Sequence, residues 1–242
     1  MTIDEEIEQI RQWRDRQLQW ISAISNETYK RILLVACIDA FVQHQDSIYI
    51  LKGQGKRISN QKAFSSFLQY YIHDEQIQKW MRLACPTTLF YDYQEDLKTT
   101  TLSLSTDEMR IYAADDSEAI AESERLIQLL PECKREKARE KHQYSALIYQ
   151  MRNKLVHEMT LVGCPVSFFT EDSDPIPHLV VLDKHENNKL IPYKWTLHIP
   201  VKLIWNCFIE SSENYLNECQ EQQRPPLGKY DPNQKSTFAF YD

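Results

Sequence analysis

The fold of this chain is decided by residues 27–43, ETYKRILLVACIDAFVQ. The run at 32–37 is apolar on nearly every side of a helix, which predicts a helix that other helices surround. Ser25 and Asn26 precede it, and their side chains can end one helix and cap the next. The apolar character is interrupted by Asp39, and the stretch is too short to span a bilayer. We therefore expect residues 27–43 to form the centre of a soluble core.

The residues on either side of this central helix predict further helices, each with one apolar face. Thr2 followed by Glu5 fits a capping box, in which each side chain accepts a free backbone N–H at the helix start. The apolar residues that follow recur at steps near three and four and predict a first helix: Ile3, Ile7, Ile10, Trp13, Leu18, Ile21 and Ile24. Similar signals predict helices at about 60–71, capped by Ser59 or Asn60, and at about 75–83, 117–130, 132–159 and 201–219.

The composition favours the same architecture. The chain has 242 residues but only four glycines, and Glu, Gln, Lys and Leu are plentiful, a balance that suits helices. We predict a mainly α fold, an antiparallel helical bundle with a small β-hairpin inserted before the last helix. Residues 1–222 are expected to form one helical domain with insertions at about 85–115 and 165–200, and residues 223–242 a flexible C-terminal tail.

The first insertion is marked by a loss of helical periodicity. Pro86 is expected to mark the exit from the preceding helix. From Thr87 to Asp115 the pattern is irregular, and the stretch 99–105 alternates weakly, as an edge strand does. No helix is predicted between 87 and 115.

The second insertion carries a stronger β signal. Residues 179–182 and 190–197 are strand-like and flank a polar turn at 185–188, which predicts a β-hairpin. Pro192 has no backbone N–H to donate, so it places the second strand at an edge of the sheet.

Charge and cysteine usage narrow the function classes. The net charge of −7 argues against a general nucleic-acid coat, which needs an excess of Lys and Arg, so any RNA contact must be local. The six cysteines lie far apart without a C-x-x-C pair or accompanying histidines, so we expect reduced thiols and neither a metal nor a cofactor. The N-terminus is acidic and has no apolar signal region, from which we expect a cytoplasmic protein.

The chemistry-bearing segment is YQMRNKLVHE at 149–158, near the end of the helix predicted at 132–159. At 100° per residue, Asn153 and His157 lie one turn apart on the side opposite the apolar stripe, and Arg152 lies on its flank. The stripe consists of Tyr144, Leu147, Ile148, Met151, Leu155 and Met159. A core histidine is therefore disfavoured at position 157, and a solvated helix face is the remaining alternative to a functional site.

Spacing alone does not single out this segment. Arg135 and His142, in the same predicted helix, share the Arg-x6-His spacing of a looser pattern, but Glu136 stands where a polar neutral residue is wanted. The fuller context at 149–158 is what distinguishes the second match.

The segment closely resembles the signature of the HEPN superfamily (higher eukaryotes and prokaryotes nucleotide-binding), an Arg followed by a polar residue and then by His. The resemblance is sharp over 149–158 and looser elsewhere, where the order of helices suits a HEPN-like bundle. It implies a homodimer with one composite site, in which metal-independent endoribonuclease activity often serves toxin, antiviral or stress-defence systems. One subgroup has Tyr two residues after the His; Met159 stands there in this chain, which weakens a specific toxin–antitoxin assignment.

Simple chemistry agrees with this resemblance. RNA carries its own nucleophile, the 2′-hydroxyl, so cleavage to a 2′,3′-cyclic phosphate needs a proton acceptor, a proton donor and positive charge at the phosphate. His157 can act as base or acid near neutral pH, Arg152 can hold the phosphate, and Asn153 can orient either of them. We expect these three residues to be catalytic.

Residues around the motif suggest weaker roles. Asp39 is expected to be a hydrogen-bonded polar residue, with a supporting role toward Arg152 as a further option. Val156 and Tyr149 are candidates for the dimer interface. Basic residues that could contact RNA phosphates are Lys134, Arg135, Lys137, Arg139, Lys141 and Lys154, although ion pairs with Glu136 and Glu140 on a solvated face are the favoured reading for those in 134–141.

Two other function classes compete with a ribonuclease. One is a catalytically inactive HEPN-like module that dimerises or binds nucleic acid or a nucleotide, since a fold does not fix a function. The other is a purely structural interaction protein, in which Val156 would matter more than His157. An inhibitor or activator protein is a further expected partner of the ribonuclease.

Overall fold

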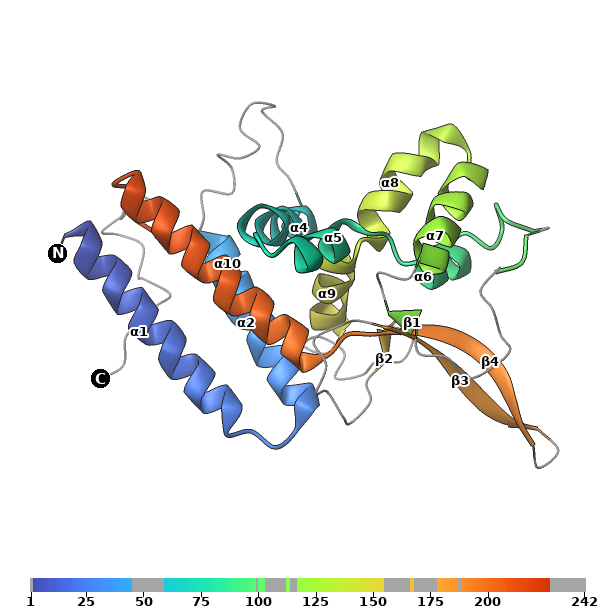
Figure 1. The fold of residues 1–242 in the computed structure, drawn as a ribbon, viewed down its shortest axis with the longest axis horizontal. Coiled ribbons are helices and arrows are strands. Elements are labelled where there is room, and N and C mark those ends of the chain that lie inside the picture. The colour runs from blue at the N-terminus through green and yellow to red at the C-terminus, as the bar shows by residue number, and fades with distance from the viewer. Residues whose placement is uncertain are drawn as a thin grey trace.

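The computed structural model describes residues 2–44, 59–98, 100–102, 112–113, 117–154, 166–167, 178–186 and 189–226, with backbone alone for some of them. In these ranges the chain is mainly helical, as the sequence predicts, and it carries a two-stranded β-arm beside the helices (Figure 1).

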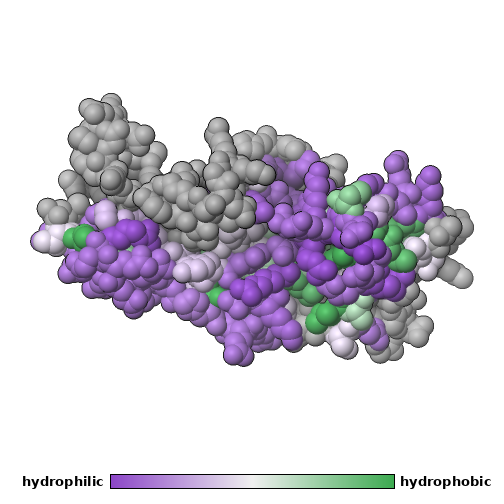
Figure 2. All heavy atoms as spheres, turned by 90° about the horizontal axis from the view of Figure 1, so that it is seen from above, coloured by the Kyte–Doolittle hydropathy of each residue, from purple (hydrophilic) through white to green (hydrophobic). Residues whose placement is uncertain are grey.

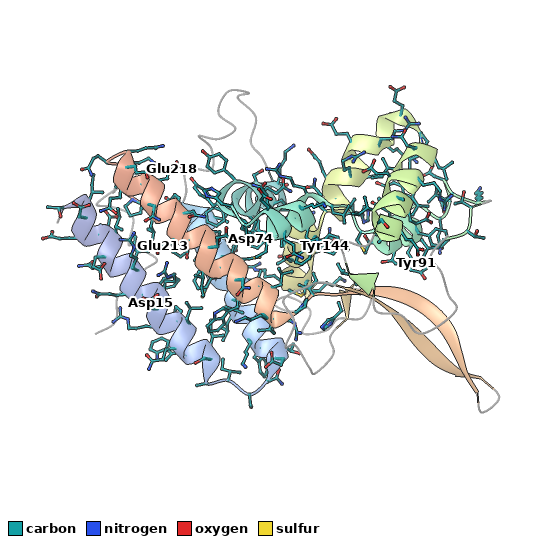
Figure 3. The ribbon with its side chains drawn as sticks, viewed as in Figure 1. Asp15, Asp74, Tyr91, Tyr144, Glu213 and Glu218 are labelled. Atoms are coloured by element: carbon teal, nitrogen blue, oxygen red, sulfur yellow. The ribbon has the colours of Figure 1, made fainter. Side chains whose placement is uncertain are left out.

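The first, second and last helices lie side by side (Figure 1). α1 (Ile3–Ser22) begins with the predicted capping box, and α2 (Glu27–His44) begins where Asn26 Oδ1 accepts the backbone N–H of Tyr29 at 3.1 Å. α10 (Val201–Glu221) packs on both helices. Side-chain ion pairs join α1 to α10, because Glu213 of α10 (Figure 3) accepts from Arg11 at 2.9 Å and from Arg14 at 2.6 Å.

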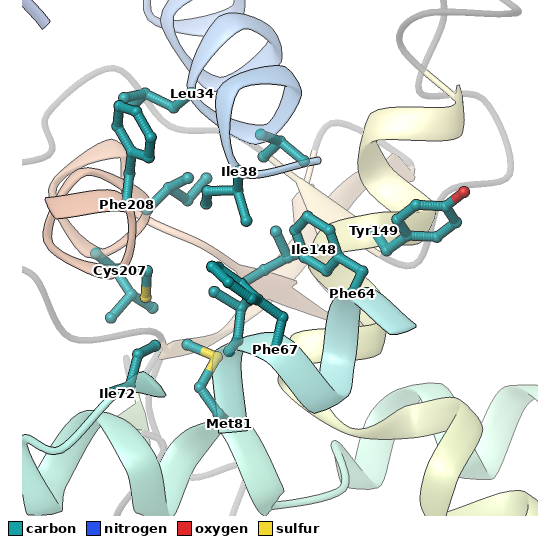
Figure 4. Packing of buried hydrophobic residues seen from close by; sticks show 14 of the residues in the cluster. Leu34, Ile38, Phe64, Phe67, Ile72, Met81, Ile148, Tyr149, Cys207 and Phe208 are labelled. Atoms are coloured by element: carbon teal, nitrogen blue, oxygen red, sulfur yellow. The ribbon is translucent and has the colours of Figure 1, made fainter. Parts of the chain in front are cut away.

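The main core lies between this group and three more helices, α4 (Asn60–Tyr71), α5 (Glu75–Arg82) and α9 (Tyr144–Asn153). The predicted N-cap Ser59 accepts the N–H of Lys62 at 3.2 Å. α9 packs against α2, α4 and α5, so it sits near the centre of the molecule. Close packing of buried side chains from α2, α4, α5, α9 and α10 is shown in Figure 4, including Leu34, Ile38, Phe64, Phe67, Met81, Ile148 and Phe208.

The helix predicted at 132–159 is wrong in one respect, because it is two helices. α8 (Glu132–His142) ends at Gln143, whose backbone is extended at φ −61° and ψ 146°, and α9 starts immediately after it. Residues 83–85 replace the missing helical hydrogen bonds: Cys85 N donates to the carbonyl of His142 at 2.9 Å, and Tyr144 N donates to the carbonyl of Leu83 at 3.1 Å. The break therefore fixes where α9 begins, and residues 155–159 lie outside the described ranges.

A smaller core lies beside α8 and corrects the prediction for 87–115. This stretch contains most of α6 (Pro86–Asp92), where Pro86 starts a helix because the first turn needs no donor from its nitrogen. α6 packs with α7 (Ser117–Leu129) and α8 around Leu89, Leu97, Leu126, Ile127 and Ala138. Of the stretch expected to be an edge strand, residues 100–102 are described and are not in a strand.

The predicted hairpin is confirmed. β3 (His178–Glu186) and β4 (Lys189–His198) pair antiparallel, and two short strands, β1 (Tyr112–Ala113) and β2 (Val166–Ser167), extend the sheet in the order β1-β3-β4-β2. The register shifts between Leu182 and Asp183, so that Asp183 pairs with Pro192. β2 pairs with β4 only at Leu197 and His198, so in the described residues the Pro192 part of β4 has a strand on one side, as an edge position requires.

The start of the predicted tail folds back onto α10. Arg224 N donates to the carbonyl of Cys219 at 2.9 Å, its guanidinium pairs with Glu218 at 3.2 Å, and the Tyr215 hydroxyl donates to the carbonyl of Pro226. Residues 224 and 226, which were predicted to belong to the tail, therefore contact α10, and residues 227–242 lie outside the described ranges.

The described surface is mostly polar on the face drawn in Figure 2, and the described cysteines are unpaired. Much of the described surface in Figure 2 is hydrophilic, with small separate apolar spots. No helix in the described ranges is long and apolar enough to cross a membrane. The five described cysteines are free thiols, and burial raises the pKa of Cys37 to about 12; Cys164 lies outside the described ranges.

Candidate functional site

The structure places the first part of the chemistry-bearing segment at the end of α9. Arg152 and Asn153 are the last two residues of this helix, and Lys154 caps it. Val156 and His157 lie outside the described residues, so the position of the predicted imidazole and of one predicted interface residue stays a prediction.

The predicted helical phase of α9 is confirmed for the part that the structure describes. Tyr144, Leu147, Ile148 and Met151 are all fully buried, at 0% exposure. Arg152, Asn153 and Lys154 are partly exposed. The end of α9 thus turns its polar residues away from the core stripe.

Arg152 is held at two points. Its Nη2 donates to Asp39 Oδ2 at 3.2 Å, and its Nη1 donates to Asn153 Oδ1 at 3.0 Å. The Asp39 side chain is 12% exposed and the Arg152 side chain 21% exposed, so the pair is largely shielded from water. The supporting role considered for Asp39 from the sequence therefore corresponds to a direct contact between α2 and α9.

The remaining donors of this guanidinium define what it can bind. Arginine has five N–H groups, of which Asp39 and Asn153 take one each. The Nε–H is buried and has no hydrogen-bond partner among the described residues. One N–H therefore remains on each terminal nitrogen of Arg152, and together they can donate to the oxygen atoms of a phosphate or carboxylate.

Tyr149, predicted for the dimer interface, packs within a single chain. It is 8% exposed, and its ring lies 5.4 Å from that of Phe64 of α4. Figure 4 shows its hydroxyl pointing away from the cluster of apolar side chains. Any contact with a second chain would use this hydroxyl edge, because the ring face is already covered.

The competing match, Arg135 and His142, serves the structure of the domain. Arg135 of α8 donates to the backbone carbonyls of Leu130 at 3.0 Å and Gln128 at 2.8 Å, at the C-terminal end of α7, where free carbonyls need donors. His142 is 2% exposed. Both side chains are therefore engaged in contacts within the domain.

His142 is buried within a polar group between α6 and α8. The hydroxyl of Thr88 donates to the Cys85 carbonyl at 3.1 Å, and since a hydroxyl has one proton, His142 Nδ1 donates to Thr88 Oγ1 at 2.9 Å. His142 Nε2 lies 3.3 Å from Asp92 Oδ2, close enough for an ion pair when the ring is protonated but without hydrogen-bond alignment. Together with Lys141, whose Nζ lies 2.6 Å from Asp92, this contact lowers the pKa of Asp92 well below its usual range.

Three of the five basic residues predicted on α8 pair with acids on other parts of the chain, and not with Glu136 and Glu140 as the favoured interpretation expected. The N–O distances are 2.7 Å for Lys134–Asp96, 2.6 Å for Arg139–Glu124 and 2.6 Å for Lys141–Asp92. Glu140 pairs with Lys62 of α4 at 2.9 Å. Two of the predicted phosphate contacts on α8 pair with no described acid: Arg135, which donates to backbone carbonyls, and Lys137, which is exposed.

Sequence reasoning missed the partners of His142. Thr88 and Asp92 lie in a stretch where no helix was predicted, so nothing in the pattern placed them one turn apart on α6. No group of three or more metal-binding side chains occurs within the described ranges.

Comparison with known proteins does not assign the chain to a family. No family model, no curated protein and no solved structure matched the chain.

Proposed function

We propose that this chain is a HEPN-type endoribonuclease that cleaves RNA without a metal ion. One observation carries the proposal: Arg152, in the segment that resembles the HEPN signature, is fixed at the end of α9 with two N–H groups left for an oxyanion. The polar end of α9 and the buried apolar stripe behind it support the same assignment. We propose that this ribonuclease acts in a toxin, antiviral or stress-defence system.

The reaction follows from the residue types. The 2′-hydroxyl of RNA loses its proton as it attacks the adjacent phosphorus, the bond from phosphorus to the 5′-oxygen breaks, and that oxygen takes a proton. The products are a 2′,3′-cyclic phosphate and a 5′-hydroxyl. His157 moves a proton, Arg152 stabilises charge on the phosphate oxygens, and Asn153 orients the Arg152 fork to which it is bonded.

Two copies of the chain complete the proposed site. One motif supplies a single imidazole, whereas this reaction needs both a base and an acid. A homodimer with the two motifs facing each other would supply one imidazole for each task. Val156, which follows Arg152 closely in the motif, is the proposed contact residue of this dimer.

Cleavage of RNA by purified protein in EDTA tests the proposal. The expected result is cleavage by the wild type and none by the His157→Ala and Arg152→Ala variants, with helical content retained. His73→Ala is the matched control, because His73 is exposed and lies between α4 and α5. Equal cleavage by wild type and His157→Ala would refute the proposal, and RNA binding without cleavage under any condition would favour the inactive module.

A further inference from the structure

We propose that Asp39 is a positioning residue for Arg152: its carboxylate fixes the guanidinium so that the two remaining terminal N–H groups face an RNA phosphate. This inference rests on the proposed ribonuclease function. The two residues are 113 positions apart in the sequence and meet because α2 packs against α9. The contact therefore depends on the fold and not on local sequence.

The surroundings of Asp39 explain why its carboxylate needs a cation. Its neighbours along α2 include Ile38 and Val42, which are buried at 0% and 1% exposure, and Asp39 itself is 8% exposed. A carboxylate at such a position is costly unless a charged hydrogen-bond donor compensates it. Arg152 Nη2 supplies that donor at 3.2 Å, so each member of the pair restricts the other.

A guanidinium held at two points has little freedom left. Asp39 and Asn153 bind different terminal nitrogens of Arg152, which fixes the plane of the group as well as its distance. The N–H groups that remain are then directed before a ligand arrives. Such pre-orientation raises the rate because the entropy of ordering the side chain is spent in folding and not in the transition state.

The contact between Asp39 and Arg152 is also compatible with an inhibitory role for Asp39, and the two roles predict different results. If Asp39 instead held Arg152 away from RNA, its negative charge would compete with phosphate, and its removal would raise RNA affinity. The fixed geometry favours positioning, since Asp39 and Asn153 together leave one N–H free on each terminal nitrogen. Positioning predicts weaker function when Asp39 loses its charge.

Two substitutions separate charge from shape. Asp39→Asn keeps the size of the side chain and removes its charge, whereas Asp39→Glu keeps the charge and moves the carboxylate by one methylene. Glu213→Gln is the matched control, because Glu213 also accepts hydrogen bonds from arginines between two helices but lies between α1 and α10. Circular dichroism and thermal unfolding give the folded fraction of every variant.

The test is kcat for RNA cleavage per folded molecule, together with RNA affinity measured in the His157→Ala background. We expect kcat to fall on the order of 10- to 100-fold in Asp39→Asn, to recover in part in Asp39→Glu and to stay unchanged in Glu213→Gln. RNA affinity should fall or stay level in Asp39→Asn. If Asp39→Asn does not fold, Asp39→Glu alone decides, with kcat expected between that of the wild type and one-tenth of it.

Three results would count against the inference. A wild-type kcat in folded Asp39→Asn, or in Asp39→Glu where Asp39→Asn does not fold, would reduce Asp39 to a structural residue while leaving the ribonuclease intact. Tighter RNA binding in Asp39→Asn would establish competition with phosphate. Absence of cleavage by the wild type would instead refute the proposed function, and this inference with it.

Discussion

The backbone N–H of Cys85 donates to the carbonyl oxygen of His142 at 2.9 Å, and this bond ties the start of α6 to the point where α8 ends and α9 begins. Tyr144 N closes the same bridge from the other side by donating to Leu83. Because Arg152 lies near the opposite end of α9, the bridge sets the position of the helix that carries the candidate site.

Replacing His142 with alanine should destabilise this junction. The substitution leaves Thr88 Oγ1 without its donor and removes a buried ring, so we expect the free energy of unfolding to fall by about 1–3 kcal/mol. Urea denaturation followed by circular dichroism measures the change. His73→Ala, at an exposed position, should change it little, and equal effects of the two variants would contradict the assigned role of His142.

The Asp92 carboxylate should make stability depend on pH in the acid range. His142 and Lys141 lower the pKa of Asp92 in the folded protein. The contribution of this carboxylate to the free energy of unfolding is therefore full above its usual pKa of about 4, and it is lost as the pH falls toward the lower pKa of the folded state. Unfolding free energies at about pH 5 and about pH 3 should differ more for the wild type than for Asp92→Asn. Asp15→Asn is the control, since Asp15 has an arginine contact on a more exposed surface; an unchanged difference in Asp92→Asn would contradict this account.

Ile148 should be a major source of stability. This residue of α9 is fully buried in the main core, and its truncation to alanine opens a cavity. We therefore expect the free energy of unfolding to fall by about 3 kcal/mol. The measurement is again chemical denaturation. Gln150→Ala, in the same helix but only partly buried, is the matched control, and a loss below that of this control would show that the core does not extend to α9.

The ion pairs of α8 predict which basic residues do not contribute to RNA binding. Lys134 and Arg139 are neutralised by Asp96 and Glu124, so alanine at either position should leave RNA affinity and its salt dependence nearly unchanged. Fluorescence anisotropy with labelled RNA, in the His157→Ala background, measures both quantities. Exposed Lys137 serves for comparison, and a clear loss of affinity in Lys134→Ala or Arg139→Ala would place RNA along α8.

Local sequence signals predicted much of this fold. The capping box of Thr2 and Glu5, the cap at Ser59, the apolar stripe of α9 and the β-hairpin all depend on residues close together in the chain, and the structure has each of them. The charge of Asp39 within an apolar helix was a sufficient signal to suggest a partner. These features follow from periodicity, capping and burial.

Features that depend on distant segments were not predictable in the same way. The break at Gln143 involves neither proline nor glycine and is stabilised by backbone bonds to residues 83–85. The acids that pair with α8 lie on α6, on α7 and in the turn after α6, whereas sequence spacing could suggest only acids on α8 itself. Such contacts are settled by tertiary packing, which periodicity does not describe.

The most direct test of the central claim is the chemistry of the cleaved RNA ends. A short RNA of defined sequence is incubated with the wild-type protein in EDTA, and the masses of the fragments are determined, with His157→Ala and Arg152→Ala in parallel. The account predicts fragments with 2′,3′-cyclic phosphate and 5′-hydroxyl ends from the wild type and intact RNA from both variants. Intact RNA with the wild type, or fragments with 3′-hydroxyl and 5′-phosphate ends, would contradict it.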